Sequence, residues 1–148
     1  DLGFNYRMSD IHAALGFSQL ERLDSFVKRR HEILSTYEEN LKVKNVTLPF
    51  QSEDSYSSLH LFPIELRLEN LSKSKEEIFH QLRNEGLGVN VHYIPIHMQP
   101  FYKSLGFKKG DFPDSEDYYK RTITLPMYPS MEEKEIFKVI SVLETVVY

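Results

Sequence analysis

The sequence predicts a two-layer α+β domain in which helices lie on one side of a small, mixed or antiparallel sheet. Three observations predict this fold. Apolar residues recur at helical spacing along a proline-free run that ends near Leu41. Short strand-like stretches follow it, and helix-capping patterns separate them. The expected order is a long helix, two strands, a helix, a strand, a helix, a strand and a final helix.

The first helix is expected to begin at Asp10, with Ser9 as its N-cap, and to continue to about Leu41. It is one helix, or two that bend near Asp24 and Ser25. At about 1.5 Å per residue it would be more than about 40 Å long, which exceeds what a compact domain of this size needs. We therefore expect it to pack against something beyond its own domain. This divides the chain into residues 1–41 and residues 42–148.

Two strands follow the first helix. Residues 45–50 predict a short strand, and the polar residues 51–58 predict a loop. The alternation in "LHLFPIELRL" predicts a strand from Leu59 to Leu68. Pro63 within it favours an edge position or a bulge, because proline cannot donate to a strand ladder.

The next helix and strand are marked by local signals. Ser74 and Glu77 form a capping-box pattern, and Ile78, Phe79 and Leu82 give the helix behind them an apolar face. Gly86 is expected to end this helix. Residues 87–94, "LGVNVHYI", predict the following strand.

The last part of the chain predicts a short helix opened by Asp114, a strand in "ITLPMYP" and a final helix. Ser130 and Glu133 form a second capping-box pattern before that final helix. Pro126 and Pro129 indicate a rigid turn that leads into it.

Composition excludes several classes of function. The 148 residues carry a net charge of −4 and no polybasic run, which argues against a general nucleic-acid binder and against an anionic membrane surface. The absence of cysteine excludes disulfides and thiolate metal sites. No apolar run approaches the roughly 20 residues of a membrane span, and nothing resembles a secretory leader. A cytoplasmic location is expected.

The residues before the first helix predict an anion site. The first N–H groups of a helix are unpaired donors with a partial positive charge. Asn5 and Arg7, placed just before Ser9, would complete a site for phosphate or carboxylate. The alternative is that Arg7 pairs with a surface carboxylate and Asn5 shapes a turn.

A second group of polar residues lies in "NVHYIPIHMQPFY". A strand delivers His92 and Tyr93, and His97 follows in a loop, so these residues could line a pocket. His92 and His97 could also be metal ligands, although no carboxylate close in sequence completes the set, or they could simply pack a domain edge. No P-loop, dinucleotide fingerprint or nucleophile with a base is present. The residues alone thus predict parts of a pocket without a catalytic residue.

Three stretches together resemble the C-terminal part of the DegT/DnrJ/EryC1/StrS family of sugar aminotransferases. They are "LGFNYRMSDIHAALGFSQLERLD", "GVNVHYIPIHMQPFY" and "DFPDSEDYYKRTITLPMYPSM". The last two are similar to the branch of the family that acts toward pseudaminic acid. The resemblance implies the C-terminal domain of a fold-type I enzyme that depends on pyridoxal 5'-phosphate (PLP).

The resemblance also implies an enzyme more than twice this length. Its N-terminal domain would hold PLP and the Schiff-base lysine, upstream of Asp1, so the chain alone is expected to be inactive. The implied reaction transfers an amino group from glutamate to C4 of a UDP-linked 4-keto-6-deoxy sugar, for polysaccharide or flagellin-glycan precursors.

Site residues follow from the same resemblance. Asn5 would contact the cofactor phosphate of the neighbouring subunit in a homodimer, and Arg7 would support that phosphate or the sugar nucleotide. His92, Tyr93 and His97 would contact substrate. Residues 1–41 would link to the PLP domain and form the dimer interface. Two other hypotheses stay open: a non-enzymatic α+β ligand-binding or regulatory module, and a metal-dependent sugar-nucleotide enzyme.

Overall fold

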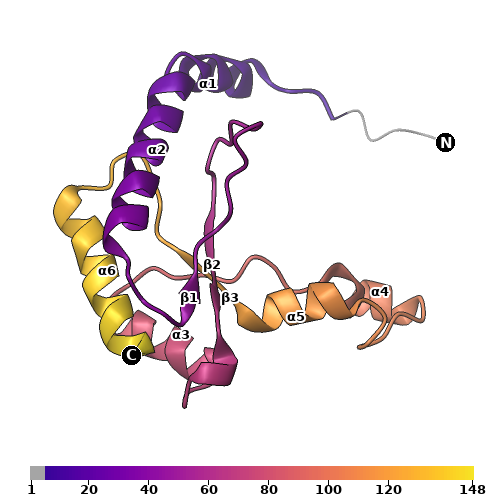
Figure 1. Ribbon diagram of the computed structural model, residues 1–148. Helices are drawn as coiled ribbons and strands as arrows, with labels where there is room; N and C mark the ends of the chain where they lie inside the picture. The colour runs from indigo at the N-terminus through magenta and orange to yellow at the C-terminus, as the bar shows by residue number, and fades with distance from the viewer. Residues whose placement is uncertain (1–5) are drawn as a thin grey trace.

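The computed structural model describes residues 6–148 and shows an α+β architecture, which confirms the predicted fold class (Figure 1). Two 3-10 turns, Leu68–Asn70 and Ile96–Met98, lie between the longer elements. These elements are α1 (Asp10–Leu20), α2 (Leu23–Asn40), β1 (Val46–Thr47), β2 (Phe62–Leu66), α3 (Lys75–Asn84), α4 (Pro100–Ser104), α5 (Pro113–Arg121), β3 (Thr122–Leu125) and α6 (Glu133–Val147).

The sheet is antiparallel, with strand order β1-β2-β3. Strand β2 is therefore central, and the expected edge position of Pro63 is wrong. Pro63 lies opposite Thr124 of β3, whereas β1 pairs only with the other end of β2, at Glu65 and Leu66. Continuing the β1 register would place Pro49 opposite Pro63, and neither residue has an N–H to donate. The proline thus occupies the part of the central strand that is paired on one side only.

The strand predicted at residues 87–94 is reduced to one isolated bridge. Asn90 pairs with Thr124, and each N–H donates to the other carbonyl at 3.1 and 2.8 Å. The next N–H, of Val91, goes to the side-chain oxygen of Asn90 at 2.8 Å instead of a neighbouring strand. The segment therefore runs alongside β3 without extending the sheet.

The first helical region consists of two helices, not one. Ser9 is the N-cap of α1, as predicted, and its Oγ accepts the His12 N–H. α1 ends in a tight turn in which the Arg22 N–H donates to the Gln19 carbonyl at 3.1 Å. The break at residues 21–22 precedes the bend expected at residues 24–25, and the Ser25 hydroxyl donates to the Arg22 carbonyl at 2.7 Å just after it.

The two predicted capping boxes have different outcomes. At α3 the box is confirmed, because Ser74 Oγ accepts from the Glu77 N–H and the Glu77 carboxylate accepts from the Ser74 N–H. At α6 the box predicted at Ser130 and Glu133 is wrong. The N-cap is Glu132, and Glu135 completes the box two residues later.

The core lies between the sheet and helices α2, α3 and α6, which form one layer, while α4 and α5 project away from it as an arm (Figure 1). All four residues of β3 are buried. We call residues 96–121 the α4–α5 arm. The largest fully buried side chains of the core include Tyr37, Phe62, Ile33, Ile64, Leu66, Ile78, Leu82, Ile123 and Leu143.

Helix α1 contributes nothing to this core. Each of its residues is exposed, including Ile11, Leu15, Phe17 and Leu20, although its mean hydropathy is the highest of the longer helices. A helix with apolar residues on all sides is typical of a buried position. Within residues 6–148, no helix combines the length and apolarity that a bilayer crossing requires.

The capping carboxylates predict how stability depends on pH. Backbone hydrogen bonds from Ser74 and Glu132 hold the pKa values of Glu77 and Glu135 below the ordinary glutamate value of 4.5. Because the folded pKa is depressed, each carboxylate stabilises the fold fully above about pH 4.5, and this stabilisation is lost as the pH falls through the folded pKa.

We expect the double variant Glu77→Gln and Glu135→Gln to lose less stability between about pH 6 and about pH 3 than the unsubstituted chain. Urea unfolding at each pH measures this. The control is Glu53→Gln, an exposed glutamate in the loop before β2. Parallel acid profiles for the double variant and the unsubstituted chain would contradict the prediction.

Candidate functional site

The start of α1 presents the described part of the predicted anion site. Arg7 is exposed and Ser9 caps the helix, while Asn5 lies outside the described residues. The Ser9 hydroxyl also lies 3.0 Å from His12 Nδ1. Sequence reasoning missed His12 as a neighbour of this site. Its spacing of three from the N-cap, which places both side chains on the first turn, was the available signal.

His92 and Tyr93 lie together at the edge of β3. His92 Nδ1 is 2.9 Å from the hydroxyl of Thr124, which is a buried residue of β3. The Tyr93 ring contacts the His92 ring edge-on at a centroid distance of 4.6 Å and is 69% exposed. The sheet therefore fixes the imidazole, while the phenol faces outward. This arrangement leaves Tyr93 available to a ligand.

His97 lies elsewhere, inside the α4–α5 arm. It is 6% exposed, and its Nε2 is 2.8 Å from Glu116 Oε1. The same oxygen accepts the Gly110 N–H at 2.6 Å. The backbone hydrogen bond from Gly110, followed by the one from His97, lowers the pKa of the Glu116 carboxyl. Glu116, in α5, thus connects the turn that carries His97 with the loop that contains Gly110.

The structure does not place His92 and His97 together as ligands of one possible metal site. Their polar partners are separate, Thr124 for one and Glu116 for the other. Across residues 6–148, no group of three histidine, aspartate or glutamate side chains could hold a metal ion. The described residues therefore offer no support for a metal site.

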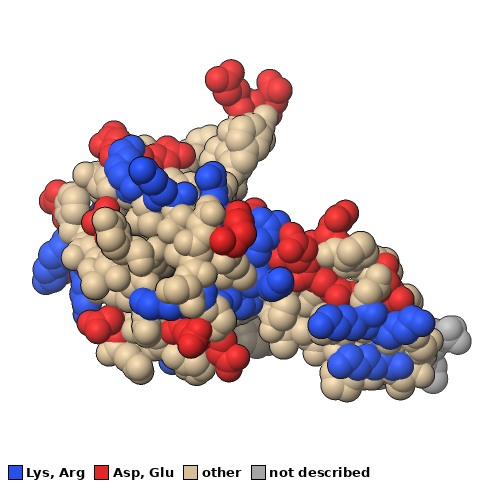
Figure 2. Space-filling view, turned by 60° about the horizontal axis from the view of Figure 1, so that its bottom comes forward, with Lys and Arg blue, Asp and Glu red and all other residues tan. Residues whose placement is uncertain are grey.

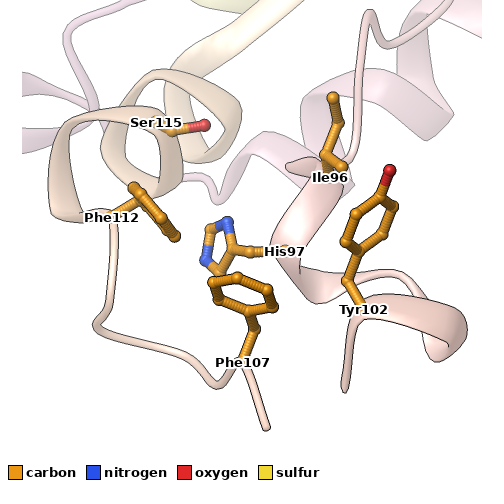
Figure 3. Close-up of a pocket in the computed structure, with 6 residues that line it drawn as sticks. All are labelled: Ile96, His97, Tyr102, Phe107, Phe112 and Ser115. Carbon is orange, nitrogen blue, oxygen red and sulfur yellow. The ribbon is translucent and has the colours of Figure 1, made fainter. Parts of the chain in front are cut away.

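A cavity of about 290 Å³ opens in the arm beside His97. Figure 3 shows the His97 imidazole in the middle, with Phe107 and Phe112 below and to the left of it. Ile96 and Tyr102 lie to its right, and the Ser115 hydroxyl lies above it. His97 was predicted to line a pocket and does line this cavity, whereas the contribution of Phe107 and Phe112 to its walls was not predicted. The signal was the spacing of Tyr102, Phe107 and Phe112, which are each five residues apart around a glycine-containing loop.

The turn before α6 is a scaffold. The Tyr37 hydroxyl donates to the Pro126 carbonyl at 2.8 Å, and burial raises the pKa of this phenol. Arg29 Nη2 donates to the Met131 carbonyl at 2.8 Å. Helix α2 thereby holds the turn at both ends.

Comparison with protein families gives one match across nearly the whole chain. The pattern of the DegT/DnrJ/EryC1/StrS aminotransferase family matches residues 1–144. The chain belongs to the DegT/DnrJ/EryC1/StrS aminotransferase family. The resemblance stated from the three sequence stretches is confirmed.

Two relatives illustrate the DegT/DnrJ/EryC1/StrS likeness. The spore coat polysaccharide biosynthesis protein SpsC of Bacillus subtilis is 36% identical over 148 residues, which cover 98% of this chain and 38% of that protein. The UDP-4-amino-4,6-dideoxy-N-acetyl-β-L-altrosamine transaminase of Campylobacter jejuni is 36% identical over 136 residues, which cover 91% of this chain and 36% of that enzyme. The chain thus spans less than two fifths of the length of these relatives.

A solved structure shows the same fold. The PLP form of Spr1654 from Streptococcus pneumoniae, a protein assigned as a sugar aminotransferase, superposes with a TM-score of 0.86 and 30% sequence identity. The match covers 95% of this chain and 36% of that one. The fold is therefore that of a C-terminal domain of a PLP-dependent aminotransferase, as the sequence resemblance implied.

Proposed function

We propose that the chain is the C-terminal part of a PLP-dependent enzyme that transfers an amino group from glutamate to C4 of a UDP-linked 4-keto-6-deoxy sugar. Such a product would serve as a precursor of a polysaccharide or flagellin glycan. The family match across residues 1–144 is the observation that carries the proposal. The Campylobacter jejuni relative supports a nucleotide-sugar substrate, and the Bacillus subtilis relative supports polysaccharide synthesis.

The described residues fit the phosphate of PLP but not its attachment. PLP supplies the electron sink for transamination when it is bound. The first turn of α1 presents backbone N–H groups close to Arg7 in sequence, and such groups are the donors that a phosphate accepts from. Burial lowers the pKa of Lys75, but its Nζ donates to the Tyr119 carbonyl and lies 4.1 Å from the centre of the Tyr119 ring. The engagement of Lys75 agrees with the placement that the family resemblance implies, in which the attachment lysine belongs to a preceding domain.

Assembly into a homodimer follows from the same proposal. Residues 1–41 would connect to the PLP domain and form part of the subunit interface, which would cover the exposed apolar side chains of α1. Asn5 would then reach the cofactor phosphate of the neighbouring subunit, with Arg7 beside it. Residues 42–148 would close one side of the sugar-nucleotide pocket.

The substrate contacts proposed for His92, Tyr93 and His97 differ in kind. His92 is held by the Thr124 hydroxyl, so it can orient a bound sugar or diphosphate with little loss of entropy. Tyr93 is exposed and can donate its hydroxyl hydrogen. His97 is buried in the arm and can reach a ligand only through the arm cavity.

Replacing Asn5 by alanine in the full-length enzyme is expected to weaken PLP binding by about 10- to 100-fold. The reason is that a hydrogen bond to a charged group contributes about 1.5–3 kcal/mol. Equilibrium titration of the apoenzyme with PLP measures the effect. Asn84→Ala, in an exposed position at the end of α3, is the matched control.

Cofactor affinity that stays the same in Asn5→Ala would remove the phosphate role. The 148-residue chain itself is proposed to have no transaminase activity. Turnover of a UDP-linked 4-keto sugar by this chain, supplied with PLP and glutamate, would overturn that part of the proposal.

A further inference from the structure

The segment that carries His92 is attached to β3 at two points. The first is the bridge between Asn90 and Thr124, in which each backbone N–H donates to the carbonyl of the other at 3.1 and 2.8 Å. The second is the contact of 2.9 Å between His92 Nδ1 and the Thr124 hydroxyl oxygen. His92 is two residues after Asn90, and diagonal neighbours across an antiparallel pair lie within reach of a ring. One residue of β3 therefore holds both the backbone and the imidazole of this segment.

The surroundings of Thr124 decide which atom donates in this contact. The residue is only 5% exposed. Its backbone N–H and carbonyl are both engaged by Asn90, and Pro63, which lies opposite it in β2, has no N–H. Among the hydrogen bonds of residues 6–148, the Thr124 hydroxyl has no partner except His92 Nδ1. Because a buried hydroxyl hydrogen is costly to leave without an acceptor, this hydrogen is directed at Nδ1.

This direction fixes the position of the proton on His92. A hydroxyl that donates to Nδ1 places the proton of a neutral imidazole on Nε2. His92 is partly exposed, and no hydrogen bond within the described part of the chain engages its Nε2. The edge-on contact with the Tyr93 ring, at a centroid distance of 4.6 Å, restricts the imidazole further. The Nε2–H is thus the ring donor that remains for an external acceptor.

A carboxylate beside the ring would reverse this arrangement, because it would accept from Nδ1–H and leave Nε2 as an acceptor. His97 has such a partner, since its Nε2 lies 2.8 Å from Glu116 Oε1. The acidic side chains of the arm lie along one of its edges (Figure 2). No ion pair formed by residues 6–148 includes His92. The hydroxyl of Thr124 is therefore the group that sets the tautomer of His92.

We propose that Thr124 is the positioning residue for His92 in the enzyme. Its hydroxyl donates to Nδ1, keeps the proton of the neutral imidazole on Nε2, and so makes His92 a hydrogen-bond donor to an oxygen atom of the substrate. A sugar hydroxyl, a carbonyl and a phosphate each offer such an oxygen. The contact of His92 with substrate rests on the proposed function, whereas the direction of the Thr124 hydrogen bond stands independently of it.

Nitrogen NMR of the 148-residue chain tests the tautomer without cofactor or substrate. Isotope-labelled histidine rings give separate signals for protonated and unprotonated nitrogens, and the spectrum of His92→Gln identifies the signals of His92. At about pH 8.5, well above the ordinary histidine pKa of about 6.5, we expect Nε2 of His92 to carry the proton and Nδ1 to be unprotonated.

Substitutions in β3 test the role of the hydroxyl. Thr124→Val removes it and keeps the branched shape, so the two His92 nitrogens are expected to exchange their proton and their signals to move toward each other. Thr124→Ser keeps the hydroxyl and is expected to retain the original spectrum. The matched control is Thr122→Val in the same strand. Thr122 is 1% exposed and its hydroxyl donates to the Tyr118 carbonyl at 2.7 Å, so the control loses a buried hydroxyl without touching His92.

Kinetics of the full-length enzyme test whether the donor acts on substrate. Thr124→Val is expected to raise the KM of the sugar nucleotide by about 3- to 10-fold and to change kcat by less than about 2-fold. Thr124→Ser is expected to restore the KM to within about 2-fold. Adding Thr124→Val to His92→Gln is expected to change the KM by less than about 2-fold, because no imidazole is left to position. Urea unfolding of each variant chain shows that it is folded.

Several results would overturn the proposal. One is a proton on Nδ1 of His92 in the unsubstituted chain, and another is a Thr124→Val chain whose His92 signals do not move. A KM that is unchanged in Thr124→Val, or that is not restored by Thr124→Ser, would exclude the hydroxyl as the cause. A full effect of Thr124→Val in the His92→Gln enzyme would show that Thr124 does not act through His92.

Failure of this arrangement and failure of the proposed function give different results. If the chain shows the expected tautomer and loses it in Thr124→Val, while the full-length protein transfers no amino group to a UDP-linked 4-keto sugar, the function is wrong and the hydrogen bond stands. If the full-length enzyme is active and the proton lies on Nδ1, the arrangement is wrong and the function stands.

Discussion

Replacing Phe62 by alanine is expected to lower the free energy of unfolding by about 3–5 kcal/mol. Phe62 begins the central strand and is fully buried. Its ring stacks on that of Tyr37 at a centroid distance of 4.9 Å, so it joins the sheet to helix α2. The substitution removes this contact and leaves a cavity that the surrounding strands can fill only in part.

Urea unfolding at neutral pH measures the loss for Phe62→Ala. Phe50→Ala removes the same group from an 89% exposed position and is expected to change stability by less than about 0.5 kcal/mol. Phe62→Leu keeps most of the buried volume and is expected to lose less than the alanine variant. A loss below about 1 kcal/mol for Phe62→Ala would show that the Tyr37–Phe62 contact does not join the two layers.

A charge on helix α1 is expected to have little effect on the stability of the 148-residue chain but to disrupt the assembly of the full-length enzyme. Leu15 is 57% exposed, so Leu15→Glu should change the stability of the 148-residue chain by less than about 0.5 kcal/mol. In the proposed dimer the same position is covered, and a buried unpaired carboxylate costs several kcal/mol. We therefore expect loss of assembly and of most transaminase activity.

Light scattering of the full-length enzyme gives its mass, and the rate of amino transfer from glutamate gives its activity. Lys28→Glu places a glutamate at an exposed position of α2, with a larger change of charge, and serves as a stringent control. A Leu15→Glu enzyme that stays dimeric and active would exclude α1 from the interface. The unfolding midpoint of the 148-residue variant shows separately that the substitution leaves its own fold intact.

Local patterns predicted the features that depend on neighbouring residues. The N-cap at Ser9 and the capping box at Ser74 are set by side chains within three residues of the backbone groups they bind, so the sequence displays them. At α6 two pairs with the same spacing, Ser130 with Glu133 and Glu132 with Glu135, could each form a capping box. The position of the helix start depends on the turn that Tyr37 and Arg29 hold from α2, and no local pattern carries that information.

The candidate site was predicted as a list of residues but not as an arrangement. His92 and His97 were predicted as residues that could line a pocket, and the side chain that fixes His92 is that of Thr124, 32 positions away. His97 similarly depends on Glu116, 19 positions away. The Thr124 contact follows from the bridge between Asn90 and Thr124, and the Glu116 contact follows from the return of α5 to the turn that carries His97. The aromatic cavity depends on the same return of the chain.

The exposure of α1 has a consequence for how this chain can vary. Every residue from Tyr6 to Ser25 is exposed, and the buried side chains begin at Val27. A substitution between Tyr6 and Ser25 is therefore expected to change the stability of the domain little, whereas a substitution in the core is expected to lower it. The core side chains are constrained by their own packing, whereas in the proposed dimer the side chains of α1 would be constrained by the surface that they contact in the assembly.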